Sequence, residues 1–255
     1  MLDGIGRVRL GGWILVLGMA WAGVSQAGAD YAREKKWADE ITPGIVVGDP
    51  VYPQEKGGHK FLALYTPAPN AKGAVIIAHG MGVHPDYGLY GQLRTMLPER
   101  GYTTLSIQMP VLAADAKADD YPPLFPESAE RIGAAAAWLK ARGYDRVALV
   151  SHSMGARMAN YYLTHTGAPG VQAWVAVGIT APIEKPNEIP VPTLDIHGDG
   201  DLPVVLKGTA ERAFYLRRIK GSAQVVVAGA DHFFAGKEPD LARFIANFLD
   251  QALPK

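Results

Sequence analysis

The chain has 255 residues, enough for one large α/β domain or two small ones. Hydrophobic residues make up 48% and charged residues 20%, so the composition supports a sizeable core and excludes a disordered chain. Basic and acidic residues number 25 each and form no stripe or tail, which argues against nucleic acid as a partner, and the lack of cysteine excludes disulfides and thiolate chemistry.

The N-terminal residues have the pattern of a secretory signal peptide. Arg7 and Arg9 precede an apolar run at 13–22, and residues 24–27 offer a small-x-small cleavage site. The run is shorter than the ~20 residues that a membrane-spanning helix needs, and no cysteine follows it for lipid attachment.

We therefore expect cleavage near Ala27 or Ala29, with residues 1–29 as signal peptide and residues 30–255 as one domain. The mature protein is expected to be periplasmic or secreted, without a stable membrane anchor.

Short apolar runs alternate with longer amphipathic stretches in the rest of the chain. Predicted strands lie at 44–47, 61–65, 74–78, 103–107, 147–150, 173–177, 192–196 and 224–227. Continuous hydrophobic runs such as 75–78 are typical of strands buried on both faces of a parallel sheet.

Predicted helices lie between these strands, at 87–100, 128–142, 154–166, 209–219 and 239–252. The alternation predicts right-handed βαβ crossovers in a mostly parallel eight-stranded sheet with helices on both faces. The first two strands have no helix between them, so we expect them to be antiparallel. Loops 109–126 and 180–190 each follow a strand's carboxyl end, where open α/β sheets bind ligands.

Ser153 is the candidate nucleophile. A buried strand runs into an amphipathic helix through Ser151-His-Ser-Met-Gly155, a pattern typical of a sharp turn that exposes the central hydroxyl. The helix dipole and the amide of Met154 would favour developing negative charge there. Ser151 replaces the glycine of the usual G-x-S-x-G pattern, and a structural helix N-cap at Ser153 is the alternative interpretation.

A second hydrophobic strand ends in His79-Gly-Met-Gly82, where glycines let a backbone amide approach a substrate. We expect the amide of Met81 to be the second oxyanion donor.

The acid and base follow later strands. Asp201, at the loop tip after Gly198, is the expected partner of an imidazole, with Asp199 next and Asp195 also a competitor. His232 follows the last predicted strand and is the expected base. The chain order Ser153, Asp201, His232 is the order of nucleophile, acid and base expected for a nucleophile at a strand-to-helix turn of this kind.

These residues resemble the α/β-hydrolase superfamily, and the similarity runs from about residue 44 to residue 253. Segments 78–85 and 105–112 look like an uncharacterised bacterial branch that carries signal peptides. The resemblance implies acyl transfer to water through a serine ester intermediate. Only 28 residues separate Gly178 from Lys207, which leaves no room there for a large cap domain.

The expected function is that of an exported hydrolase for a small carboxylic ester or thioester, without cofactor or metal. The alternatives are a peptidase or amidase of envelope peptides and a catalytically inactive binding protein. His79, His84, Gln108, Tyr121 and His152 are candidate substrate contacts, with a structural role as the alternative for each. The spacing of His79, His84 and Asp86 matches no zinc motif.

Overall fold

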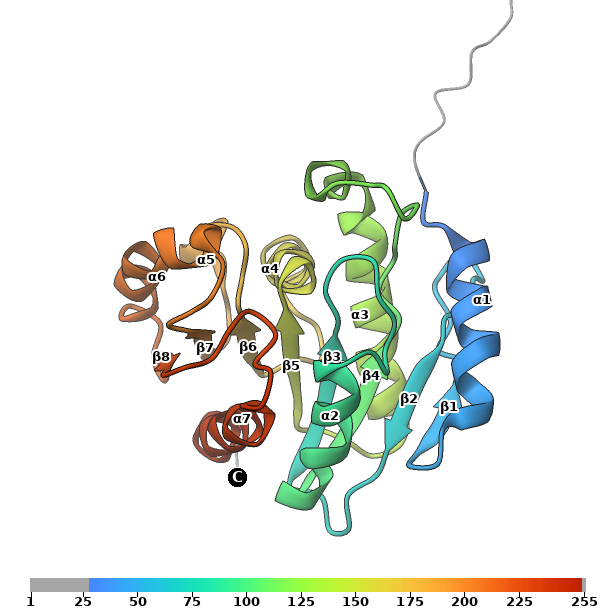
Figure 1. Ribbon diagram of the computed structural model, residues 1–255. Coiled ribbons are helices and arrows are strands. Elements are labelled where there is room, and N and C mark those ends of the chain that lie inside the picture. The colour runs from blue at the N-terminus through green and yellow to red at the C-terminus, as the bar shows by residue number, and fades with distance from the viewer. Residues whose placement is uncertain (1–27, 254–255) are drawn as a thin grey trace, which may run out of the picture.

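The computed structural model describes residues 28–253, and it contains an open eight-stranded sheet in the order β1-β2-β4-β3-β5-β6-β7-β8 (Figure 1). The predicted signal peptide, apart from Gly28 and Ala29, lies outside these residues. The strands are β1 Asp49–Val51, β2 Ala63–Thr66, β3 Gly73–Ala78, β4 Tyr102–Ile107, β5 Val147–His152, β6 Ala173–Val177, β7 Thr193–Gly198 and β8 Ala223–Val227.

The sheet is mostly parallel, as predicted. Strand β2 is antiparallel to both β1 and β4, and the other neighbouring pairs are parallel. The sheet therefore starts with an antiparallel pair as expected, but its first strand is Asp49–Val51 and not 44–47. Between β6 and β7 lies a loop with one 3-10 turn, Pro186–Glu188, and no cap domain.

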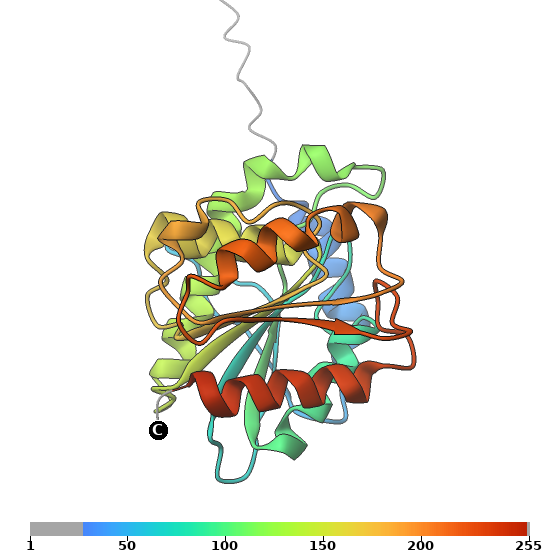
Figure 2. The ribbon, with the colours of Figure 1, turned by 90° about the vertical axis from the view of Figure 1, so that its left-hand side faces the viewer.

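Helices cover both faces of the sheet (Figures 1 and 2). The helices are α1 Tyr31–Ile41, α2 Leu89–Met96, α3 Phe125–Lys140, α4 Met154–Thr166, α5 Pro203–Lys207, α6 Thr209–Leu216 and α7 Glu238–Ala252. Helices α3, α4 and α6 share one hydrophobic core with the sheet, and α2 and α7 share the other. No helix in the described part of the chain is long and apolar enough to cross a membrane.

The alternation of side chains along each strand builds these two cores. Every residue of β3 to β7 is buried. Ile76 faces the core of α3 and α4, and its neighbour Ile77 faces the core of α2 and α7. Burial on both faces explains why the sequence of these strands is hydrophobic without interruption.

One predicted strand is wrong, and three predicted helices end earlier than expected, at Met96, Lys140 and Leu216. No strand forms at 44–47: Thr42–Gly44 is a 3-10 turn, Val46 is 93% exposed, and β1 begins at Asp49. The helix expected at 87–100 ends at Met96, because Pro98 cannot donate to a preceding carbonyl and instead begins a 3-10 turn. Helix α1 and the short α5 had no counterpart among the predicted helices.

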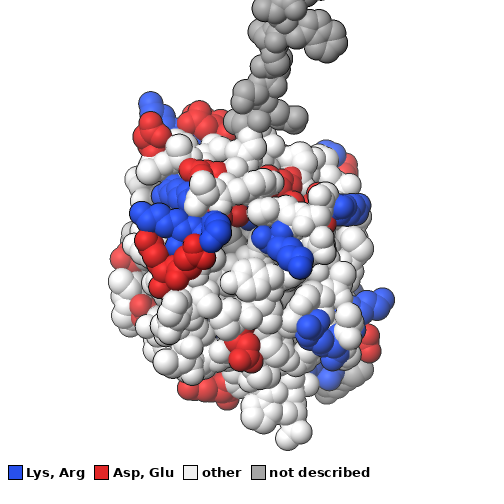
Figure 3. All heavy atoms as spheres, turned by 90° about the vertical axis from the view of Figure 1, so that its right-hand side faces the viewer, with Lys and Arg blue, Asp and Glu red and all other residues white. Residues whose placement is uncertain are grey.

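Helix α1 is held to the rest of the molecule by a buried ion cluster around Arg131 of α3. The Arg131 guanidinium donates to Glu34 (2.9 Å), Glu55 (2.7 Å) and Glu127 (2.5 Å). Arg131 is fully buried, and Glu34 and Glu55 are buried as well. On the side of the molecule where α1 lies, Lys and Arg are mixed with Asp and Glu among uncharged residues (Figure 3).

Candidate active site

Ser153 occupies the turn between β5 and α4 with φ +56° and ψ −119°, a strained conformation for a residue with a side chain. Its backbone N–H donates to the Val177 carbonyl oxygen over 3.0 Å. Two residues later only glycine fits, because a Cβ on Gly155 would lie 2.3 Å from the His79 carbonyl oxygen. The tight approach of α4 to β3 therefore fixes the turn that presents the Ser153 hydroxyl.

The side chains of Ser153, His232 and Asp201 form one hydrogen-bonded chain. His232 Nδ1–H donates to Asp201 Oδ1 over 2.6 Å, and the Ser153 hydroxyl donates to His232 Nε2 over 3.0 Å. The carboxylate fixes this tautomer, because it can only accept. Burial alone would raise the pKa of Asp201. The hydrogen bond from His232 and the electrostatic interaction with that imidazole lower the pKa by more, so it lies below its usual value.

The two competing carboxylates have other partners. Asp199 Oδ1 accepts the Gly229 N–H over 2.8 Å at the surface. Asp195 is buried in β7, where Oδ2 accepts from Arg212 over 2.8 Å and from Gln224 over 2.7 Å. Asp201 is thus the carboxylate that lies beside His232.

Gly178, directly after β6, is a functional position that the sequence analysis did not identify. The available signal was a glycine that directly follows a buried strand. Gly178 has φ +52°, and a Cβ at this position would lie 3.1 Å from both Asp201 Oδ2 and His232 Nδ1. The bare glycine leaves the space in which these two side chains meet.

Two backbone amides, one directly after Ser153 and one directly after Gly80, have no acceptor in residues 28–253. Met154 is the first residue of α4, so its amide has no acceptor within the helix. The Met81 amide has no acceptor among residues 28–253. Gly80 lies close to Ser153: a Cβ on Gly80 would be 3.3 Å from the Ser153 Cβ. Its own N–H is already donated to Tyr90 Oη over 2.8 Å.

A buried relay connects this loop to His232. The Tyr90 hydroxyl donates to His152 Nδ1 over 2.7 Å, and His152 Nε2–H donates to the His232 carbonyl oxygen over 2.8 Å. Burial, with a smaller contribution from His232, lowers the pKa of His152 to about 4, so the ring is neutral and can act as donor and acceptor at once. His152 therefore positions the backbone of His232, and Tyr90 was not singled out in the sequence.

The other candidate substrate contacts have structural partners. His79 is fully buried; its Nε2 accepts the Met109 N–H over 2.9 Å and its Nδ1–H donates to the Gly80 oxygen over 2.7 Å. Burial lowers the pKa of His79 to about 3. Gln108 donates to the Met109 oxygen over 2.8 Å, and both Gln108 and Tyr121 are 1% exposed. Burial and these contacts favour a structural role for the three side chains, which was the alternative interpretation for each.

His84 also lies among other aromatic side chains, with ring centroids 5.7 Å from Trp37 and 5.8 Å from Tyr87. Arg33 of α1 forms hydrogen bonds with the loop after β3. It donates to the Gly82 oxygen over 3.2 Å and to the Leu112 oxygen over 2.6 Å. Nothing in the polar sequence of α1 indicated this contact.

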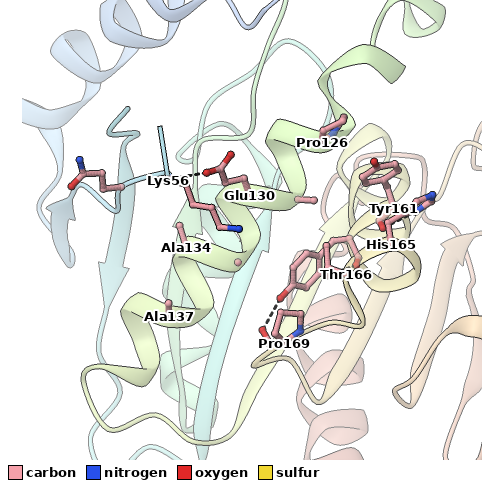
Figure 4. Close-up of a pocket in the computed structure, with 13 residues that line it drawn as sticks. Lys56, Pro126, Glu130, Ala134, Ala137, Tyr161, His165, Thr166 and Pro169 are labelled. Carbon is pink, nitrogen blue, oxygen red and sulfur yellow. Dashed lines mark hydrogen bonds between the residues drawn. The ribbon is translucent and has the colours of Figure 1, made fainter. Parts of the chain in front are cut away.

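A hollow of about 610 Å³ between α3 and α4 lies outside this constellation (Figure 4). Its floor is made of small residues of α3 such as Ala134 and Ala137, and Tyr161 and His165 of α4 form a wall. None of Ser153, Asp201 and His232 lines it. Within residues 28–253, no group of three or more His, Cys, Asp or Glu is arranged to hold a metal ion.

Comparison with known proteins agrees with this architecture. A family model described as "protein of unknown function (DUF3530)" matches residues 52–124, and no curated protein matches the chain. A putative α/β-hydrolase of unknown function from Agrobacterium tumefaciens is similar with a TM-score of 0.63 and 21% identity, over 81% of this chain and 99% of that one.

Two further structures are similar. Dienelactone hydrolase from Anabaena variabilis has a TM-score of 0.65 and 21% identity, over 80% of this chain and 99% of that one. A serine hydrolase without lid from Xanthomonas campestris has a TM-score of 0.64 and 19% identity, over 83% and 97%. At these identities the likeness is one of fold. The chain has the α/β-hydrolase fold.

Proposed function

We propose that this protein is a serine hydrolase that cleaves a carboxylic ester or thioester through an acyl-serine intermediate. The observation that carries the proposal is the hydrogen-bonded chain from Ser153 through His232 to Asp201, formed at a strained turn. The similarity to a dienelactone hydrolase and a lidless serine hydrolase supports ester hydrolysis.

In the first half of the reaction, Ser153 Oγ attacks the ester carbonyl carbon while His232 Nε2 takes the hydroxyl proton. The carbonyl oxygen becomes an oxyanion, and the amides of Met81 and Met154 are the donors that would stabilise it. The Asp201 carboxylate stabilises the imidazolium. The intermediate then collapses: the bond to the alcohol oxygen breaks, and His232 gives its proton to the leaving alcohol.

In the second half, water enters beside His232 and repeats the cycle. His232 Nε2 takes a proton from water, the hydroxide attacks the acyl carbon, and the proton returns to Ser153 Oγ as the carboxylic acid leaves. The balance is one water consumed and one acid and one alcohol released for each ester.

A fluorophosphonate probe tests the nucleophile. We expect covalent labelling of wild type at Ser153, none in Ser153→Ala, and a loss of ester turnover in that variant on the order of 10⁴-fold or more. A folded wild type that is neither labelled nor active would contradict the proposal and favour a binding protein on this fold. Equal or faster turnover of a p-nitroanilide than of the matching p-nitrophenyl ester would favour an amidase.

We also propose that the protein is exported, from the basic, apolar and small-residue pattern of residues 1–29. Cell fractionation with N-terminal sequencing should find mature protein outside the cytoplasm, starting at residue 28 or 30. Recovery of chain that still begins at Met1 in the cytoplasm would contradict export.

A further inference from the structure

A second hollow, of about 460 Å³, lies between the start of α2 and the loop that leads to α7, and Phe233, the residue after His232, is part of its wall. Three of its lining residues are aromatic, namely Tyr87, Tyr90 and Phe233, and its polar side chains are Gln92 and Glu238. We call it the aromatic hollow.

The walls of the aromatic hollow are built by neighbours of the reacting groups. Phe233 follows His232 directly, and the two rings meet edge to face with centroids 5.2 Å apart. Tyr90 lines the hollow, and its hydroxyl accepts from Gly80 and donates to His152. His232 itself does not line the hollow, so a group held here is separated from the imidazole by the ring of Phe233.

The two outer aromatic rings are unusually open to solvent. Phe233 is 55% exposed and Tyr87 is 50% exposed, whereas the inner wall, Tyr90, is 2% exposed. Exposed rings around a concave surface favour binding of another aromatic ring, because apolar area is buried and the rings can stack edge to face or offset. The carboxylate of Glu238 disfavours an anionic guest, so an uncharged aromatic group fits best.

Proton transfer decides which part of an ester occupies the hollow. Under the proposed function, on which this inference rests, His232 Nε2 must hand its proton to the leaving oxygen. The leaving alcohol therefore departs past the imidazole, which the exposed ring of Phe233 meets edge to face. We infer that the aromatic hollow is the leaving-group subsite and that it selects esters of aryl or arylalkyl alcohols.

Benzyl acetate and methyl phenylacetate test this assignment, because they are isomers that carry the same ring on opposite sides of the ester. We expect wild type to have the higher kcat/KM for benzyl acetate. In Phe233→Ala and in Tyr87→Ala that value should fall about 10-fold, mainly through KM, while propyl acetate changes less than about 2-fold. Tyr87→Ala guards against an indirect effect of the Phe233 substitution on His232.

Phe214→Ala is the matched control, because this phenylalanine is 45% exposed on α6 and does not line the hollow. It should leave all three substrates unchanged. A preference for methyl phenylacetate that the two variants abolish would assign the hollow to the acyl group and overturn the inference. Equal loss for all substrates, or no loss, would also overturn it. Hydrolysis of the acetates without aryl preference refutes only the subsite, whereas absence of labelling and of any hydrolysis refutes the proposed function as well.

Discussion

The absence of a side chain at Gly178 leaves the space in which Asp201 and His232 form their hydrogen bond. The left-handed φ of +52° at Gly178 is one that residues with a Cβ adopt only at a cost of about 1–2 kcal/mol. Two effects therefore favour glycine at position 178: the positive φ and the lack of space for a Cβ. An experiment can separate them.

Gly178→Ala should lower kcat about 10-fold, because its Cβ would stand 3.1 Å from His232 Nδ1 and push the imidazole away from its hydrogen bonds. Gly143→Ala is the control: Gly143 also has positive φ (+87°), but a Cβ there meets nothing within 4 Å. Both variants should lose similar stability in thermal unfolding, and only Gly178→Ala should lose ester turnover. Equal turnover in the two variants would show that the contact is unimportant.

Ser151 shows why this turn departs from the common glycine pattern. Its hydroxyl lies in the core, accepts from Trp174 Nε1 over 2.8 Å and donates to the Val175 oxygen over 3.3 Å. The serine therefore satisfies a buried indole N–H that a glycine would leave without a partner.

Ser151→Ala should reduce the free energy of unfolding by about 1–3 kcal/mol, because it leaves the Trp174 N–H buried and unsatisfied. Turnover under native conditions should stay within about 2-fold of wild type. Urea unfolding followed by tryptophan fluorescence measures the first effect. A variant as stable as wild type would mean that the hydrogen bond contributes nothing, and a large loss of turnover would mean that Ser151 acts in the site.

At the scale of elements, α1 depends on charge more than on apolar contact. The single Arg131 guanidinium serves Glu34, Glu55 and Glu127, so it compensates none of the three carboxylates fully. Burial therefore outweighs Arg131 and raises the pKa of Glu34 to about 7. The folded protein binds a proton at Glu34 more tightly than the unfolded chain does.

Between the unfolded pKa of 4.5 and the folded value of about 7, the folded state binds the extra proton, so the contribution of Glu34 to stability is full at low pH and is lost as pH rises through this window. Glu34→Gln should remove that dependence. Relative to the variant, wild type should lose about 1–3 kcal/mol between pH 5 and pH 8 in denaturant unfolding.

The control for this series is Glu40→Gln, a substitution on the same helix at a side chain that is 56% exposed. It should keep the pH dependence of wild type. Parallel curves for wild type and Glu34→Gln would show that Glu34 is ionised to the same degree in both states.

The predictable elements are those whose pattern is local. The run from Val147 into α4, with Gly155 after the turn, predicts both a strand and a helix, and the helix has the expected bounds. Helix α1 was not predictable from local pattern, because its main partner, Arg131, lies 97 residues from Glu34 in sequence. For the same reason, neither the Trp174 contact of Ser151 nor the Tyr90 relay to His152 can be read from a five-residue motif.

The sheet as a whole ends at β8, which pairs with β7 and with no other described strand. Its burial is partial, and Val226 is 55% exposed. An open edge with an exposed β-branched side chain can pair with another copy of the chain. The formal net charge of zero provides little repulsion between copies near neutral pH.

Val226→Lys should raise the temperature at which light scattering first reports aggregation, because an edge lysine opposes strand pairing. The melting temperature should change by less than about 2 °C, since exposed substitutions usually alter stability by no more than about 0.5 kcal/mol. Val46→Lys, at a loop residue that is 93% exposed, supplies the comparison. The same gain in both variants would reflect added charge and not the edge.

The contacts of α1 have a practical consequence for handling the protein. Asp30 caps this helix through the Arg33 N–H over 2.9 Å, and its own N–H donates to the Val111 oxygen over 2.7 Å. Arg33 in turn holds Gly82, one residue from the proposed oxyanion donor Met81. A purification tag fused directly ahead of Asp30 would lie next to these contacts, so capture of a recombinant protein by its other terminus keeps the tag away from them.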